Sequence, residues 1–416
     1  MGDIMRPVPF EELLTRIFDE YQSQRTIFGI PEQQFYTPQA QRSIGVFGES
    51  CATPLGPAAG PHTQLAQNII TAWLTGGRFI ELKTVQILDR LELEKPCIDA
   101  EDECFNTEWS TEFTLKKAWD EYLKAWFTLH LLEQVFPLGT HKESKSFIFN
   151  MSVGYNLDGI KQPPMQEFID NMMDASAHPK FAQYRDTLNR WLQNRTFIDR
   201  LPTCARKDGL DNLAQRVPAR LVEGVTLSTM HGCPPDEIEA ICRYMLTEKN
   251  LNTFVKLNPT LLGYPRVRQI LDACGFGYIG LSEESFDHDL KIDRALEMLT
   301  RLMALAKERS LGFGVKLTNT LGTVNNKGAL PGDATCANWP VMANTPDPMH
   351  ELITMPISPN RPIPFLLSID ELLCEEVLHD DASITPCREA TAKERSKQGL
   401  SSGPRASEMR RLRTTT

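Results

Sequence analysis

The fold is decided by residues 221–259, which read LVEGVTLSTMHGCPPDEIEAICRYMLTEKNLNTFVKLNP. Residues 221–228 and 252–259 are short and rich in β-branched and apolar residues, as β-strands are. Residues 235–249, between them, repeat apolar positions three and four apart, as an amphipathic helix does. Two strands joined through a helix lie parallel in one sheet, so this stretch predicts a βαβ unit.

Similar units precede and follow this stretch. Further strands are expected at residues 78–85, 145–153, 277–282 and 312–319. Further helices are expected at residues 64–76, 114–136, 264–274 and 293–310. Six parallel strands with helical crossovers suit either a TIM barrel or an open doubly wound sheet.

The domain organisation follows the same pattern. We expect an N-terminal helical extension over residues 1–45 and a βα domain over residues 46–333, with a polar excursion at 176–220. Residues 334–416 lose the βα periodicity, are rich in proline and end in a polar, basic stretch. They predict an irregular or disordered tail, because proline lacks the N–H that a sheet ladder needs.

Composition excludes several classes of protein. The net charge of −10 argues against a general nucleic-acid binder, which needs a basic face. No run of about 18 apolar residues occurs, so no membrane span is expected. The ten cysteines, without a secretory signal, fit a reducing cytoplasm. They form no CxxC pair, so no metal site is predicted.

Polar residues gather where the expected strands end, and in a βα barrel this is the face that carries chemistry. Lysines stand at or near three of these ends: Lys83, Lys256 and Lys316. Three lysines suggest an anionic ligand, or a ring whose reduced form is anionic. The alternative is that one or two of them pair with Glu81, Glu283 or Glu284.

Before the first strand comes TPLGPAAGPH, residues 53–62. Glycine and other small residues let the backbone approach a flat ligand closely and donate N–H groups to it. The alternative is a tight turn that enters a helix.

These motifs resemble a known family. TPLGPAAGP followed by FIELKTV looks like the opening of the dihydroorotate dehydrogenase-like FMN barrels. FVKLNP (254–259) is similar to their later lysine strand, and KLTNT (316–320) to the strand end of the dihydropyrimidine dehydrogenase branch. More narrowly, residues 1–333 resemble the N-terminal part of the YgfK-type oxidoreductases, a family that also carries the name selenate reductase. The resemblance implies a TIM-like (β/α)8 barrel of the FMN-linked oxidoreductase type, here missing its last strands.

The resemblance also implies site residues. FMN would be contacted by the backbone of Ala58, Ala59 and Gly60 and by the side chains of Lys83, Thr84 and Lys256. The substrate side would be lined by Asn156, Asn258, Asn319 and Thr320. A lysine ammonium beside the ring would stabilise the anionic reduced flavin.

The acid/base position departs from the family pattern. Thr229 stands where these dehydrogenases carry a catalytic cysteine, and threonine is a poor general acid or base because its pKa lies far above 7. His231 and Cys233 lie two and four residues further on, and either could take the role in a rearranged loop. Both could equally be structural.

The phosphate site departs as well. FMN barrels of this type hold the phosphate with glycine-rich backbone after their last strands, and residues 334–416 offer no such glycine pair. We therefore expect a product truncated or frameshifted after about residue 333. The iron–sulfur and FAD domains of the family are not seen in this sequence.

The sequence supports three functions. The first is an FMN-dependent oxidoreductase module that acts on a small molecule and exchanges electrons with other domains or subunits. The second is a lyase or aldolase barrel in which Lys83, Lys256 or Lys316 forms a Schiff base. The third is an inactive fragment.

Overall fold

The computed structural model describes residues 6–38, 43–87, 113–136, 138, 145–205, 207–228, 233–287, 289–317, 321 and 353–356. The chain divides into two compact units, Met1–Ile357 and Ser358–Thr416, and all of the described residues belong to the first.

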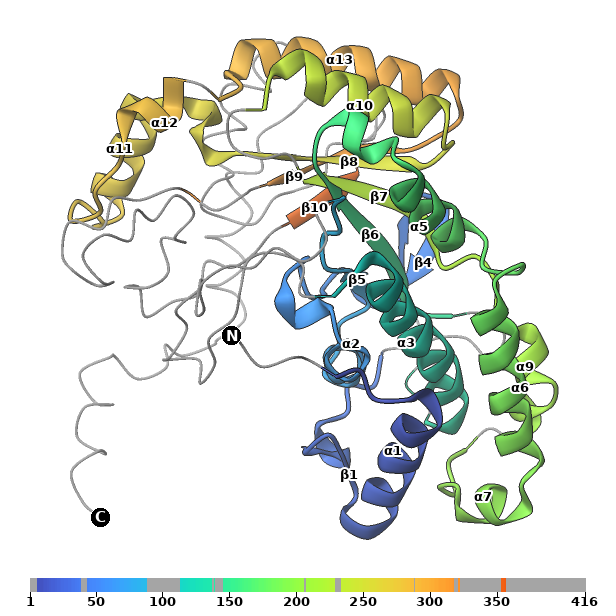
Figure 1. The fold of residues 1–416 in the computed structure, drawn as a ribbon. Helices are drawn as coiled ribbons and strands as arrows, with labels where there is room; N and C mark the ends of the chain where they lie inside the picture. Colours follow the sequence, from blue (N-terminus) through green and yellow to red (C-terminus); the bar gives the residue numbers. More distant parts are fainter. Residues whose placement is uncertain are drawn as a thin grey trace, which may run out of the picture. The chain divides into compact units, whose positions relative to one another are not determined.

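The centre of this unit is a sheet with the strand order β10-β9-β8-β7-β6-β5 (Figure 1). Five of its strands run parallel: β5 (Phe79–Glu81), β6 (Ile148–Gly154), β7 (Val222–Ser228), β8 (Asn252–Leu257) and β9 (Phe313–Leu317). Their order in the sheet follows their order in the chain, as in a βα barrel. The strands expected at both ends of the 221–259 stretch are thereby confirmed.

Helices alternate with these strands, and shorter strands precede them. The helices are α1 (Phe10–Gln24), α2 (Ala66–Leu74), α3 (Leu115–Val135), α4 (Leu157–Ile160), α5 (Pro163–Met173), α6 (Pro179–Gln193), α7 (Arg195–Arg200), α8 (Lys207–Leu210), α9 (Leu213–Arg216), α10 (Pro235–Thr247), α11 (Tyr264–Ala273), α12 (Glu283–Asp287) and α13 (Ile292–Glu308). The short strands are β1 (Thr26–Ile27), β2 (Ile30–Pro31), β3 (Ile44–Val46) and β4 (Glu49–Cys51). Residues 176–220 contain α6 to α9, and none of the described residues among them belongs to the central sheet.

One face of the sheet packs against the helices. Val225 of β7 and Val255 of β8 belong to the same hydrophobic core as Ile241 of α10 and Met298 of α13. Figure 1 shows α10 and α13 side by side, next to β8 and β9. Side chains alternate between the two faces of a strand, so residues next to these valines point to the opposite face.

The strand predicted at residues 277–282 is wrong. β9 pairs directly with β8, so no place remains for a strand between them. The apolar side chains of Ile279 and Leu281 instead pack in a small separate cluster with Val267 and Phe286. A short apolar run does not distinguish a strand from a packed loop, and here the tertiary contacts decide.

The segment after residue 333 also differs from the expectation in one place. Residues Ile353–Pro356 form β10, which pairs antiparallel with β9 at the edge of the sheet. Proline is tolerated there because an edge strand can leave one side of its backbone unpaired. The rest of residues 334–416 lies outside the described residues.

The hairpin formed by β3 and β4 packs against the face of the sheet opposite the helices, at the end where the parallel strands begin. Phe47 and Gly48, between β3 and β4, have φ values of 52° and 84°, as a two-residue type I′ turn requires. The Phe47 ring lies 4.5 Å from the Phe254 ring, and Phe79 lies 6.2 Å from Phe254. A Cβ at Gly312 would come within 1.9 Å of the Phe47 ring, so only glycine fits there.

Phe47, Phe79 and Phe254 together form what we term the aromatic layer. Phe79 and Phe254 stand on β5 and β8, which are not neighbours in the sheet, so their contact shows that the sheet is curled. We call the concave side the inner face; it carries Phe79, Glu81, Phe254, Lys256 and Lys316. The described parallel strands thus form a curled half of a barrel.

Replacing Phe254 by alanine tests the aromatic layer. Phe254 is fully buried, so Phe254→Ala should lower the free energy of unfolding by about 3–5 kcal/mol, measured by urea denaturation. Tyr278→Ala, at a residue that is 37% exposed, should change it by roughly 0.5 kcal/mol or less. Equal decreases in the free energy of unfolding for the two substitutions would contradict the packing of Phe254 in the aromatic layer.

Candidate functional site

Buried charges occupy the inner face beyond the aromatic layer. Lys256 and Lys316 are paired in register on β8 and β9, and they are 5% and 1% exposed. Lys83, two residues after the end of β5, is 5% exposed. These three lysines form what we call the lysine cluster. Glu81 of β5, 1% exposed, is the acidic residue that the structure places among them.

Glu81 joins distant parts of the domain. Its carboxylate accepts a hydrogen bond from the Lys316 ammonium and forms an ion pair with it. β5 and β9 are the two ends of the parallel part of the sheet, so this pair crosses the inside of the curl. The same carboxylate accepts the backbone N–H of Ala59 at 2.8 Å. The pairing with Glu81 that the sequence left as an alternative is therefore realised for Lys316.

The Glu81–Lys316 ion pair and the burial of the inner face shift the pKa values of Glu81 and Lys256. Burial by itself raises the pKa of the Glu81 carboxyl. The charge and hydrogen bond of Lys316, together with hydrogen bonds from Thr226 and the Ala59 backbone, outweigh this effect, so the pKa lies below its ordinary value. Burial, together with the charges of Lys316 and Lys83, lowers the pKa of Lys256 to about 7, against an opposing effect of Glu81. Lys256 therefore changes its charge near neutral pH.

The small-residue turn runs along the edge of β5. Leu55 and Pro57 accept backbone hydrogen bonds from residues of that strand. Of the predicted cofactor contacts, Ala58, Ala59 and Gly60 are half-buried. The N–H groups of Ala59 and Gly60 donate within the protein, to Glu81 and to the Thr63 hydroxyl at 3.2 Å. These two N–H groups are therefore already engaged within the protein.

Lys83 and Thr84 are fixed by their neighbours. The backbone carbonyl of Lys83 accepts a hydrogen bond from the Tyr122 hydroxyl of α3 at 3.0 Å. The Thr84 hydroxyl lies 2.7 Å from that of Ser152 on β6. Both predicted cofactor residues thus stand at the same end of the sheet as Lys256. Sequence inspection missed Tyr122, because a helix contact of this kind leaves no motif.

Asn258 directly follows β8 and is held by a buried carboxylate. Asp289, 6% exposed, accepts hydrogen bonds from the Asn258 amide at 3.2 Å and from the Thr260 hydroxyl at 2.6 Å. A carboxylate can only accept, so the amide nitrogen of Asn258 must face Asp289. No sequence motif indicates Asp289, which lies 31 residues further along the chain.

The remaining predicted residues are scattered or undescribed. Asn156 is exposed, and its side chain caps α4 by accepting the Gly159 N–H at 2.8 Å. Cys233 is half-buried, and burial, with Glu237 and Asp289, raises its pKa to about 11. Its thiol is therefore protonated at neutral pH. Four predicted residues lie outside the described residues: Thr229, His231, Asn319 and Thr320.

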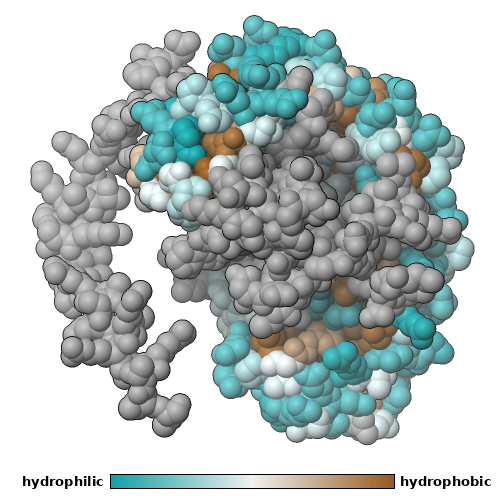
Figure 2. Space-filling model, turned by 60° about the vertical axis from the view of Figure 1, so that its left-hand side comes forward, coloured by the Kyte–Doolittle hydropathy of each residue, from teal (hydrophilic) through white to brown (hydrophobic). Residues whose placement is uncertain are grey.

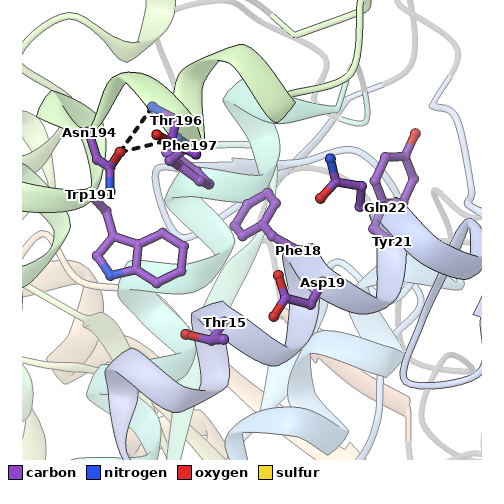
Figure 3. Close-up of a pocket in the computed structure, with 9 residues that line it drawn as sticks. All are labelled: Thr15, Phe18, Asp19, Tyr21, Gln22, Trp191, Asn194, Thr196 and Phe197. Atoms are coloured by element: carbon purple, nitrogen blue, oxygen red, sulfur yellow. Dashed lines mark hydrogen bonds between the residues drawn. The ribbon is translucent and has the colours of Figure 1, made fainter.

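A separate pocket of about 230 Å³ lies between α1 and the α6–α7 region (Figure 3). The rings of Phe18, Trp191 and Phe197 line it, and they contact one another at 4.8–6.2 Å. The Asn194 side chain there accepts the backbone N–H groups at the start of α7. These contacts join the helices, so the pocket is explained by packing.

On the face in Figure 2 the described surface is mainly hydrophilic, with small hydrophobic areas.

The pKa of Lys256 predicts a pH-dependent stability. Between pH 7 and 9 the unfolded chain, with an ordinary lysine pKa of 10.5, holds more protons than the folded chain. Stability should therefore rise with pH, by up to ~1.4 kcal/mol per unit from this group. Urea denaturation should show this slope, and Lys256→Met should remove it. Equal slopes in both proteins would contradict the burial of a titrating Lys256.

Within the described ranges, no helix is long and apolar enough to cross a bilayer.

Among solved structures, ligand-free type DHODH from Eimeria tenella is 11% identical, with a TM-score of 0.33 over 73% of this chain and 81% of that chain. DHODH from the same organism in complex with ferulenol is 12% identical, with a TM-score of 0.32 over 76% of this chain and 82% of that chain.

The sequence comparisons are stronger. YgfK of Escherichia coli (strain K12), whose name calls it an oxidoreductase, is 79% identical over 333 residues, and YgfK of strain O157:H7 gives the same values. The match covers 80% of this chain and 32% of YgfK, so the chain spans about a third of the length of these relatives. Residues 28–337 match the family described as oxidoreductase YgfK, N-terminal TIM-barrel domain. Together with the curled parallel sheet, this match shows that the chain belongs to that TIM-barrel family.

Proposed function

We propose that the chain is a flavin-dependent oxidoreductase module that binds FMN on the inner face of its barrel. The observation that carries the proposal is the lysine cluster, three buried lysines that lie with the buried Glu81 carboxylate at the end of the sheet where barrel enzymes bind ligands. A site of this charge favours a ligand that is anionic or becomes so on reduction. Membership in an oxidoreductase barrel family supports the proposal.

The residues present fit a flavin. Lys256 and Lys83 supply positive charge, and Thr84 supplies a hydroxyl beside them. The turn at 58–60 offers small side chains against which a flat ring can lie. When bound, FMN would supply hydride or single-electron chemistry, while the protein positions the ring and tunes its electronics.

Asn258 and Cys233 are the described candidates for the substrate side. Asn258, whose amide is oriented by Asp289, is the predicted substrate residue nearest to the lysine cluster in sequence. Cys233, as a protonated thiol, could donate a proton. We propose a small oxidised or heterocyclic substrate, selenate among those the family name suggests. Electrons would be exchanged with flavin or iron–sulfur domains or subunits, in the cytoplasm.

FMN binding tests the proposal directly. The purified chain should quench FMN fluorescence on titration. Lys83→Ala and Lys256→Ala should each weaken binding about tenfold or more, because each removes a buried amine that is positively charged when it is protonated. Lys307→Ala, at an exposed helix position, should leave affinity unchanged. If the unaltered chain shows no FMN binding, the alternative of an inactive fragment gains support. If all four proteins bind FMN equally, the placement of the site is wrong.

A Schiff-base lyase is a second candidate, favoured by the pKa of Lys256 near 7, which leaves much of its amine unprotonated and nucleophilic. Lys316 suits this role less well, because Glu81 holds its ammonium. Borohydride reduction in the presence of a small ketone or aldehyde should then attach the carbonyl compound to Lys256, detected by mass spectrometry of peptides. An unmodified Lys256 peptide would exclude this candidate.

A further inference from the structure

Glu81 connects three parts of the domain from the inner face. It stands on β5, holds Lys316 on β9, and accepts the N–H of Ala59 in the turn. Lys256 stands beside Lys316 on the adjacent strand, in register with it. All three charged side chains are at most 5% exposed, so water screens their interactions only weakly.

We propose that Glu81 is a positioning residue of this site: by holding Lys316 from the opposite end of the sheet, it sets the protonation state of Lys256, so that an anionic ligand beside Lys256 binds together with one proton. The proton passes from solvent to the Nζ atom of Lys256, and no covalent bond to the ligand is made or broken.

The charges around Lys256 give the sign of the effect. Lys316 on β9 and Lys83 after β5 disfavour its ammonium form, and Glu81 on β5 favours it. The two halves of the Glu81–Lys316 pair therefore act on Lys256 in opposite directions. A pair that only held the sheet together would destabilise the fold in the same direction whichever half was removed.

The ligand side of the inference rests on the proposed function. The oxidised flavin ring is neutral, and its reduced form is an anion that gains from a protonated Lys256. The preference of the chain for reduced over oxidised FMN should therefore fall as pH rises through the midpoint of Lys256, near pH 7. A tenfold change in this preference corresponds to ~30 mV in the two-electron reduction potential.

The experiment compares variants of the pair. The reduction potential of bound FMN is measured from about pH 5.5 to about pH 9, a range that brackets the expected midpoint, in the unaltered chain, Glu81→Gln, Lys316→Met and the double variant. Glu81→Gln should move the midpoint down by about one pH unit, and Lys316→Met should move it up by about one. The double variant should return it towards the original value. The amide that Glu81→Gln introduces keeps an oxygen for the Ala59 N–H, so the turn is preserved.

A matched control removes an ion pair elsewhere. Glu239→Gln breaks the pair that joins Glu239 on α10 to Arg301 on α13. It should change stability without moving the midpoint.

A second measurement needs no FMN. The pH dependence of the free energy of unfolding of the FMN-free protein reports the same Lys256 midpoint, and its shifts in the variants should have the same opposite signs. If FMN does not bind but these shifts appear, the proposed function fails while the role of Glu81 stands. If Glu81→Gln does not fold, Lys316→Met and the double variant still decide. Midpoints that stay unchanged, or that move in the same direction in both single variants, would overturn the proposal.

Discussion

The arrangement of the site depends on one buried interaction, the ion pair between Glu81 and Lys316. It connects the two ends of the parallel sheet across the concave side and is almost completely shielded from water. Removing a charge from water is costly, so each partner is stable there only while the other is present. The pair thus requires the sheet to stay curled, and the curl in turn brings Lys256 of β8 near Glu81 of β5 and Lys83 after it.

The two faces of the sheet contribute differently, one to stability and the other to the candidate site. The face covered by helices is apolar and belongs to the large hydrophobic core, which supplies most of the stability. The inner face changes character along the strands, from the aromatic layer to the charged groups. The aromatic layer fills the end where the strands begin, so the polar residues are left at the end where they finish. This division places the candidate chemistry on a rigid support.

Much of this could be predicted from local sequence. The βαβ pattern of residues 221–259 predicts parallel strands, and the lysines at strand ends predict a charged site. The strand expected at 277–282 fails because a short apolar run fits a loop equally well once it has neighbours to pack against. Pairing of Glu81 with a lysine was an alternative in the sequence, but the choice of Lys316, 235 residues away, was not predictable. The partner of Asn258 was not predictable either, because Asp289 lies 31 residues away in the chain. Such contacts depend on the curl of the sheet and leave no sequence motif.

The central claim is that the lysine cluster is a cofactor site, and a crystal structure of the chain grown with FMN tests it most directly. The account predicts electron density for the flavin ring on the inner face, with the ring beside Lys256 and against the turn at residues 58–60. Flavin density elsewhere on the protein, with the lysine cluster occupied only by solvent, would contradict it.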